Sequence, residues 1–334
     1  MDLIIKPTQK CNFCCKFCSS NKISSNGDHL LPLELIYTII EKNDIETIIV
    51  NGGDPLMVSP QYYFKIINFL NDKKIKTSLS LTTNLWDFYL NPDKWVELFK
   101  NKRVGITTSF QYGNERLIRK EYNNDDNQVF DETKFLKIIE LFNKKIGYTP
   151  NFISVITDDN EDKAIDTVNL AKKINTECKL NPAVCSGRTI NHYPIWKAYK
   201  IYLDIIDRGL EKYEYNSKNL KNFLNGKNTS CPHCRHCWKN IRAISPEGLM
   251  HSCGSYNDDH FDNIILNRKT YELSQYNEKE ILIDHKFLKK ECLQCTMYSL
   301  CNTCFKYMDD IRFSNTIEEH CYNMQKLKDR FEAL

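Results

Sequence analysis

Apolar residues follow two different periods along the first two thirds of the chain. Short β-branched or leucine-rich runs, typical of buried strands, are each followed by a stretch in which apolar residues recur every three or four positions, as on one face of a helix. The runs predicted as strands are residues 3–5, 45–50, 77–81, 104–108, 152–156 and 179–180. The stretches predicted as helices are residues 33–40, 60–70, 95–99, 135–142, 162–174 and 195–206.

The regular alternation of strand and helix predicts an α/β fold, in which a parallel sheet is connected by right-handed crossovers. Periodicity alone does not distinguish a doubly wound sheet from a barrel. Beyond about residue 215 the alternation stops, and a polar stretch rich in Asn and Lys leads into a cysteine-rich region. We therefore expect two domains, 1–215 and 216–334.

Composition and charge bear on the cellular location of the protein and on the partners it can bind. The 334 residues are 41% hydrophobic, which is sufficient for a sizeable core, and 46 Lys and Arg face 43 Asp and Glu. A net charge of +3 gives no electrostatic basis for binding nucleic acid or an anionic membrane. The chain begins without a signal-peptide pattern and contains no apolar stretch of about 20 residues. We expect a cytoplasmic protein with neither a membrane nor a nucleic-acid partner.

Fifteen cysteines are the most unusual feature of the composition, and they are clustered. Four lie between Cys11 and Cys18 and nine between Cys231 and Cys321, whereas Cys178 and Cys185 stand apart and receive no role. Because no export signal accompanies them, metal or cluster ligation is favoured over disulfide bonds.

The first group directly follows the first predicted strand. Cys11, Cys15 and Cys18 have the spacing Cys-x3-Cys-x2-Cys, and three thiolates so close can bind three irons of one cubane and leave the fourth iron open. A loop at the carboxyl end of a barrel strand is also where barrel enzymes keep their active sites. The alternative is a structural zinc site, in which Cys14 completes two Cys-x2-Cys pairs.

This spacing, with Asn12 after the first cysteine and Phe17 before the last, resembles the signature of the radical SAM superfamily. The resemblance implies a partial (β/α)6 TIM-type barrel, a 4Fe-4S cluster on the three cysteines and bound S-adenosylmethionine. It also implies contacts to S-adenosylmethionine from strand-end residues, namely Gly52, Gly53, Asp54, Pro55, Thr83, Asn84, Ser109 and Arg188. Asp54 stands where the family has the longer Glu, which weakens the expectation of a side-chain contact there.

The C-terminal cysteines look like a SPASM extension, the module that carries two auxiliary 4Fe-4S clusters. By resemblance, the first auxiliary cluster takes Cys231, Cys237, Cys253 and Cys304, and the second takes Cys292, Cys295, Cys301 and Cys321. The chain departs from the family in having two residues, not three, between Cys301 and Cys304, and in the surplus Cys234. The alternative is a set of zinc knuckles that include His233 and His236.

The resemblance implies reductive cleavage of S-adenosylmethionine to a 5'-deoxyadenosyl radical, with an electron donor such as flavodoxin or ferredoxin. The substrate class most often associated with the SPASM module is a ribosomally made peptide or a protein side chain, and the catalytic residues stay unidentified. Because the first strand begins almost at Met1, we expect leader recognition to need a separate protein or another surface.

Anaerobic sulfatase maturation is disfavoured, because those enzymes place a catalytic aspartate after the cysteine that corresponds to Cys253, and this chain has Gly254. Two other classes stay open: radical chemistry on a small molecule such as a sugar or an amino-acid derivative, and a non-catalytic zinc-binding interaction protein.

Overall fold

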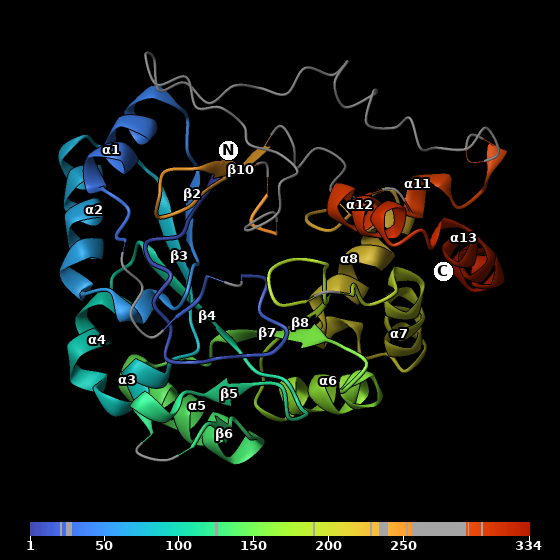
Figure 1. Cartoon of the computed structure of the whole chain (residues 1–334), viewed down its shortest axis with the longest axis horizontal. Coiled ribbons are helices and arrows are strands. Elements are labelled where there is room, and N and C mark those ends of the chain that lie inside the picture. The colour runs from blue at the N-terminus through green and yellow to red at the C-terminus, as the bar shows by residue number, and fades with distance from the viewer. Residues whose placement is uncertain are drawn as a thin grey trace. The chain divides into compact units, whose positions relative to one another are not determined.

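A computed structural model describes most of the chain. The described residues are 1–20, 22–24, 29–123, 126–189, 191–227, 229–233, 240–251, 253–255, 292, 294–301 and 303–334. They fall into two compact units (Figure 1). The first contains Met1–Ile153, Ser186–Arg188 and the described part of Asn240–Ser274, and the second contains Ser154–Cys185 and the described parts of Thr189–Lys239 and Gln275–Leu334.

The first unit is built on a sheet whose strand order is β10-β9-β1-β2-β3-β4-β7. The strands are β1 (Asp2–Ile5), β2 (Thr47–Val50), β3 (Ser78–Thr82), β4 (Val104–Ser109), β7 (Asn151–Ile156), β9 (Ile241–Ile244) and β10 (Met250–His251). Neighbours pair in parallel except β10, which runs antiparallel to β9. All the carboxyl ends of the parallel strands therefore share one edge.

Helices cover one face of this sheet, where α1, α2 and α4 lie in a row in Figure 1. The helices of the unit are α1 (Leu33–Lys42), α2 (Pro60–Asp72), α3 (Trp86–Leu90), α4 (Pro92–Phe99) and α5 (Glu132–Ile146). A short hairpin, β5 (Leu117–Ile118) with β6 (Gln128–Val129), and two 3-10 turns, Pro55–Met57 and Lys120–Tyr122, complete it.

Local sequence signals set the helix ends. The Ser59 side chain caps α2 by accepting a hydrogen bond from the Gln61 N–H, and Pro60 occupies the first helical position. Asp131 caps α5 in the same way through the Lys134 N–H, and Gly147 ends that helix with a φ of 100°. The sequence therefore provides a cap at the start of α2 and at both ends of α5.

The second unit contains the carboxyl half of β7, β8 next to it in the strand order, and a set of helices. Its elements are β8 (Cys178–Pro182), α6 (Ala164–Lys173), α7 (Ile195–Asp207), α8 (Tyr215–Leu224), α11 (Tyr298–Cys301), α12 (Phe305–Phe313), α13 (Ile317–Lys326) and α14 (Lys328–Glu332), with 3-10 turns at Glu161–Lys163 and Glu211–Tyr213. An ion pair within α12 is almost completely buried: Lys306 and Asp310 are 3.0 Å apart and each is 3% exposed. Both also bind the Cys185 backbone, Lys306 donating to its carbonyl and Asp310 accepting from its N–H.

The predicted α/β class with a parallel sheet is confirmed, and every strand and helix predicted up to residue 206 is present within a few residues of its expected bounds. The sequence analysis predicts no strand after residue 180, whereas the structure has β9, which pairs in parallel with β1. Arg242 interrupts the apolar residues of this segment, so the sequence pattern did not mark it as a buried strand, although the Arg242 side chain is buried in the structure. None of the helices in the described part of the chain is long and apolar enough to cross a membrane.

Candidate functional site

The cysteine loop leaves the carboxyl end of β1 and is held by backbone hydrogen bonds on two sides. The Cys11 N–H donates to the Ser24 carbonyl at 2.9 Å. From the turn after β2, the Gly53 and Asp54 N–H groups donate to the Thr8 and Lys10 carbonyls, both at 2.8 Å. The start of the loop therefore has a fixed place beside the turn that follows β2.

The three cysteines of the predicted cluster differ in exposure. Cys11 is 7% exposed, and Cys15 and Cys18 are half-buried. Burial raises the pKa of the Cys11 thiol well above its ordinary value, and Asp54, Cys15 and Cys18 add to the shift through their negative charge. Among the residues that the structure describes, no three His, Cys, Asp or Glu side chains are arranged to hold a metal ion. The assignment of Cys11, Cys15 and Cys18 as ligands therefore stays a sequence-based prediction.

The two glycines after β2 allow the turn to pack directly against the cysteine loop. A Cβ on Gly53 would lie 2.0 Å from the Lys10 carbonyl oxygen, and one on Gly52, whose φ is 121°, would lie 2.7 Å from the Thr8 carbonyl oxygen. Neither contact is sterically possible without moving the backbone. The close approach that these glycines permit is thus between two loops of this chain.

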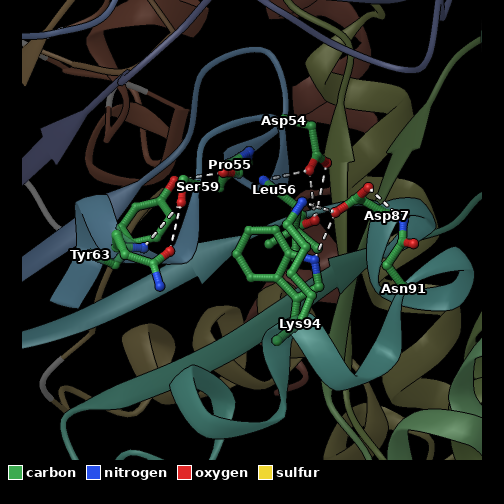
Figure 2. A network of polar contacts seen from close by, with 11 residues as sticks. Asp54, Pro55, Leu56, Ser59, Tyr63, Asp87, Asn91 and Lys94 are labelled. Atoms are coloured by element: carbon green, nitrogen blue, oxygen red, sulfur yellow. Dashed lines mark hydrogen bonds and ion pairs between the residues drawn. The ribbon is translucent and has the colours of Figure 1, made fainter.

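Asp54 links the ends of β2 and β3. Its carboxylate is 2% exposed and accepts hydrogen bonds from the Leu56 N–H (2.9 Å), the Asn84 N–H (2.7 Å) and the Thr83 hydroxyl (2.9 Å) (Figure 2). Burial raises the pKa of Asp54 to about 6, although these hydrogen bonds and the nearby Arg116 oppose the shift. With these three donors in place, the Asp54 carboxylate holds two loops of the protein together.

Below this carboxylate, Figure 2 shows a second polar group formed by Asp87, Asn91 and Lys94. Asp87 accepts from Lys94 at 2.8 Å and from the indole N–H of Trp95 at 2.7 Å, which fastens α3 to α4. This group stabilises the helices behind the strand ends and carries none of the residues predicted to bind a cofactor.

Asn84 extends the network from β3 to the cysteine loop. Its side-chain amide donates to the Asn12 side-chain oxygen at 2.6 Å, and its own oxygen accepts from the Trp86 N–H at 2.8 Å. All of these atoms are buried. The predicted residues Asp54, Thr83 and Asn84 therefore form one continuous network that reaches the residue next to Cys11.

Ser109, the last residue of β4, lies beside a residue that sequence reasoning missed. Arg116 is 5% exposed and donates from Nη2 to the Ser109 hydroxyl at 2.6 Å. Its guanidinium also lies over the rings of Phe13 and Phe130, 5.0 and 5.4 Å from their centroids. A buried cation thus stands at the carboxyl end of β4, next to the cysteine loop. Its sequence position on a polar loop gave no indication of burial.

Arg188 also lies at the cysteine loop. Its guanidinium donates to the Cys15 carbonyl (3.3 Å) and the Ile23 carbonyl (3.0 Å). The preceding Gly187 has a φ of 60° and would, with a Cβ, lie 2.3 Å from the backbone of Ser19. The contact that the structure gives Arg188 is with the loop backbone, and a contact with S-adenosylmethionine stays a prediction.

In the second unit, the cysteines predicted for the second auxiliary cluster are close enough to affect one another. Burial raises the pKa of the Cys301 thiol to about 12, and Cys295, Cys321 and Cys292 add to this shift by their charge. The Gln325 side chain donates to the Cys295 sulfur at 2.9 Å. Cys292, Cys295 and Cys321 thus all influence Cys301, and the assignment of these four cysteines to one cluster stays a prediction.

The cysteines predicted for the first auxiliary cluster are described only in part. Cys231 and Cys304 both raise the pKa of the Tyr307 phenol, after the larger effect of its burial, so both thiols lie near this ring. Cys253 belongs to the first unit, where its sulfur accepts from the Ser255 N–H at 3.5 Å. Cys237 lies outside the described residues, as does the surplus Cys234. This ligand set stays a prediction.

The sequence matches the model of the Radical SAM superfamily over residues 5–171. A curated relative, the cysteine-type anaerobic sulfatase-maturating enzyme of Clostridium novyi (strain NT), is 28% identical over 182 residues, which are 50% of this chain and 46% of that protein. The match thus spans about half the length of this relative.

Several solved structures share the fold. Native anSMEcpe with bound AdoMet has a TM-score of 0.64 at 19% identity and is covered over 100% of both chains. The same enzyme with bound AdoMet and the Cp18Cys peptide has a TM-score of 0.64 at 16% identity, over 99% of this chain and 98% of that one. Streptococcus suis SuiB bound to its precursor peptide SuiA has a TM-score of 0.62 at 16% identity, over 92% of this chain and 72% of that one.

The cysteine loop at the end of β1 and the network at the ends of β2, β3 and β4 lie within the matched residues 5–171. Members of this superfamily use a 4Fe-4S cluster together with S-adenosylmethionine, which agrees with the cofactors predicted from the sequence. The chain belongs to the radical SAM superfamily.

Proposed function

We propose that this radical SAM enzyme removes hydrogen from a side chain of a peptide or protein substrate. The observation that carries the proposal is the position of the cysteine loop, the Gly52–Gly53–Asp54 turn and the Thr83–Asn84 pair at the carboxyl edge of one parallel sheet. The peptide substrate is supported by the similar structures captured with the Cp18Cys peptide and with SuiA.

Several buried polar atoms at this edge suit a polar ligand. In the described part of the chain, the Arg116 Nε, both amide atoms of Gln111 and the Asn51 side-chain oxygen are buried without a hydrogen-bond partner. Leaving such groups unpaired costs free energy, so they favour a ligand that pairs with them. The amino-acid part of S-adenosylmethionine carries a carboxylate, which the Arg116 cation is suited to bind.

Each predicted residue then has a defined task. Cys11, Cys15 and Cys18 would hold the cluster, and the backbone of Gly52, Gly53 and Pro55 would meet the amino group of S-adenosylmethionine. When bound, these cofactors supply homolytic hydrogen abstraction. The buried Asp54 holds the surrounding loops together through its hydrogen bonds.

The C-terminal cysteines are proposed to hold two auxiliary clusters with the ligand sets predicted above. The electrostatic influence of Cys292, Cys295 and Cys321 on Cys301 supports the second set. The division of the chain into a barrel, 1–215, and an auxiliary-cluster region, 216–334, is part of the same proposal, as are a flavodoxin or ferredoxin donor and a separate leader-recognition protein.

The test is anaerobic reconstitution with iron and sulfide, followed by incubation with S-adenosylmethionine and a reductant. We expect about twelve irons per chain and release of 5'-deoxyadenosine. The Cys15→Ala variant should release none, whereas the matched Cys14→Ala variant, which removes the neighbouring surplus thiol, should keep most of the activity. A colourless chain that binds zinc, and whose bound zinc is reduced equally by Cys15→Ala and Cys14→Ala, would support the zinc-binding alternative instead.

Substrate class is tested by adding candidates to the same assay and following product mass. A panel of peptides, including one with a sulfatase-type cysteine, is compared with sugars and amino-acid derivatives. The sulfatase-type peptide is included because of the Clostridium novyi relative, although Gly254 occupies the position where the resemblance implies a catalytic aspartate. Stimulation of 5'-deoxyadenosine release by small molecules and not by any peptide would contradict the proposed substrate class.

A further inference from the structure

Two arginines from separate segments grip the cysteine loop by its backbone. Arg119, which follows β5, donates from Nε to the carbonyls of Cys11 and Phe13, each at 3.1 Å, and from Nη2 to the Ile23 carbonyl at 3.1 Å. Arg188 donates to the Cys15 carbonyl at 3.3 Å and to the same Ile23 carbonyl at 3.0 Å. Together the two guanidinium groups donate to both ends of the segment that carries the cysteines.

The backbones around the two arginines reinforce this grip. On one side, the Cys14 and Lys16 N–H groups donate to the Leu117 and Glu115 carbonyls at 2.8 and 2.9 Å, and the Arg119 N–H donates to the Asn12 carbonyl at 2.9 Å. On the other side, the Arg188 N–H donates to the Cys18 carbonyl at 2.9 Å. Because these backbone polar groups are satisfied by other segments, neighbouring residues contribute strongly to the conformation of the loop.

The charges of the two arginines also lie close to the thiols. The Arg119 guanidinium donates to the Cys11 carbonyl at 3.1 Å, and the Arg188 guanidinium donates to the Cys15 carbonyl at 3.3 Å, so each charge lies next to a proposed ligand. Two cations thus stand beside a loop on which three thiolates are expected. Since a guanidinium keeps its charge at any working pH, the positive charge beside the thiolates does not change with pH.

We propose that Arg119 and Arg188 are positioning residues for the SAM-binding cluster: they fix the backbone of the cysteine loop so that its thiolates can reach one cubane, and their charges stabilise the reduced form of that cubane. The inference rests on the proposed function, because it assumes that the loop holds the cluster. Neither residue is required to touch the substrate.

The geometry requires arginine specifically. Arg119 reaches three carbonyls through a planar fork, which the single ammonium group of lysine cannot reproduce. Substitution by lysine therefore retains the charge and loses most of the grip, whereas substitution by glutamine loses both. The pair of substitutions separates the two parts of the proposal.

The experiment uses the full-length reconstituted enzyme and needs no substrate. Variants Arg119→Lys, Arg119→Gln, Arg188→Lys and Arg188→Gln are compared with the control Arg103→Lys. Arg103 also donates to a backbone carbonyl, that of Thr77 at 2.9 Å, but at the amino end of β3. Iron release to a chelator is timed, and the cluster that changes its electron paramagnetic resonance spectrum on adding S-adenosylmethionine is titrated for its midpoint potential.

We expect Arg119→Lys to release the iron of that cluster about 10- to 100-fold faster than the wild type, since at least two hydrogen bonds to the loop are lost. Arg188→Lys should show a smaller increase and Arg103→Lys none. Each glutamine variant should have a more negative midpoint potential than its lysine counterpart.

Wild-type rates of iron release in both lysine variants would refute the proposal that the arginines position the loop backbone. Equal midpoint potentials in the lysine and glutamine variants would refute the proposed role of their charge. Failure of both lysine variants to fold, judged by circular dichroism of the iron-free chain, would also overturn the proposal, because the arginines would then stabilise the whole unit. A wild-type chain that takes up no iron at all would instead contradict the proposed function.

Discussion

Asp54→Asn tests whether burial of the carboxylate between β2 and β3 lowers the unfolding free energy by an amount that depends on pH. The aspartate side chain accepts from two backbone N–H groups and one hydroxyl, but it is removed from water, and burial is the largest influence on its pKa. Asparagine has nearly the same shape and carries no charge. It avoids the desolvation cost and leaves one donor facing an NH₂ group.

The direction in which stability changes with pH follows from the pKa of Asp54, which is about 6 in the folded chain and ordinarily 3.8. A carboxyl group whose pKa is raised by folding gives its full contribution to stability below the unfolded pKa, and loses it as pH rises through the folded pKa. Between about pH 5 and pH 7.5 the wild type should therefore lose about 1.4 kcal/mol of unfolding free energy relative to Asp54→Asn.

The measurement is urea unfolding of the iron-free protein at both pH values, followed by fluorescence of the buried Trp86 and Trp95. Comparing the two chains at each pH cancels the titration of other groups. The control is Asp131→Asn. Burial raises the pKa of Asp131, but the hydrogen bonds from Lys134 lower it by more, so the pKa lies below its ordinary value. Its contribution is lost only below pH 3.8 and should stay constant in this window. A stability difference for Asp54→Asn that is constant or opposite in sign would refute the reasoning.

Two glycine substitutions in the first unit and an ion-pair substitution in the second unit probe packing, and all are measured by urea unfolding. Gly53→Ala would place its Cβ 2.0 Å from the Lys10 carbonyl oxygen and should prevent stable folding of the cysteine loop. Gly147→Ala would place its Cβ in open space, with no atom within 4 Å. It should lower the unfolding free energy by about 1–2 kcal/mol because its φ is 100°. Lys306→Met should cost about 3–5 kcal/mol because it leaves the buried Asp310 carboxylate without its cation. Adding Asp310→Leu should recover part of the loss, and not all of it, because the Cys185 backbone then loses both side-chain partners. Equal costs for the two glycines, or no recovery in the double variant, would contradict these accounts.

Much of the fold could be predicted from the sequence because its signals are local. The strand–helix alternation, the Ser59–Pro60 cap and the spacing of Cys11, Cys15 and Cys18 each depend on residues close together in the chain. The position of β9 could not be predicted, since its four residues gain their stability from pairing with β1, more than 230 positions earlier.

The candidate site was predictable in its parts but not in its connections. The turn at Asp54 and the polar residues at 83 and 84 were predicted to contact the same cofactor, but the hydrogen bonds that join them to one another were not predicted. Arg116 and Arg119 were missed, because an arginine on a polar loop usually points to solvent. Only the three-dimensional arrangement brings Arg119 to the carbonyls of Cys11 and Phe13, 108 and 106 positions away.

The pairing of β1 with both β2 and β9 has a consequence for synthesis of the chain. One side of β1 is paired once residue 50 has left the ribosome, while the other side waits for residues 241–244. During that interval an apolar strand keeps a row of free backbone donors and acceptors, the kind of edge that recruits other strands. The nascent chain is therefore at greatest risk of aggregation before β9 emerges, and premature termination between these points should yield insoluble fragments.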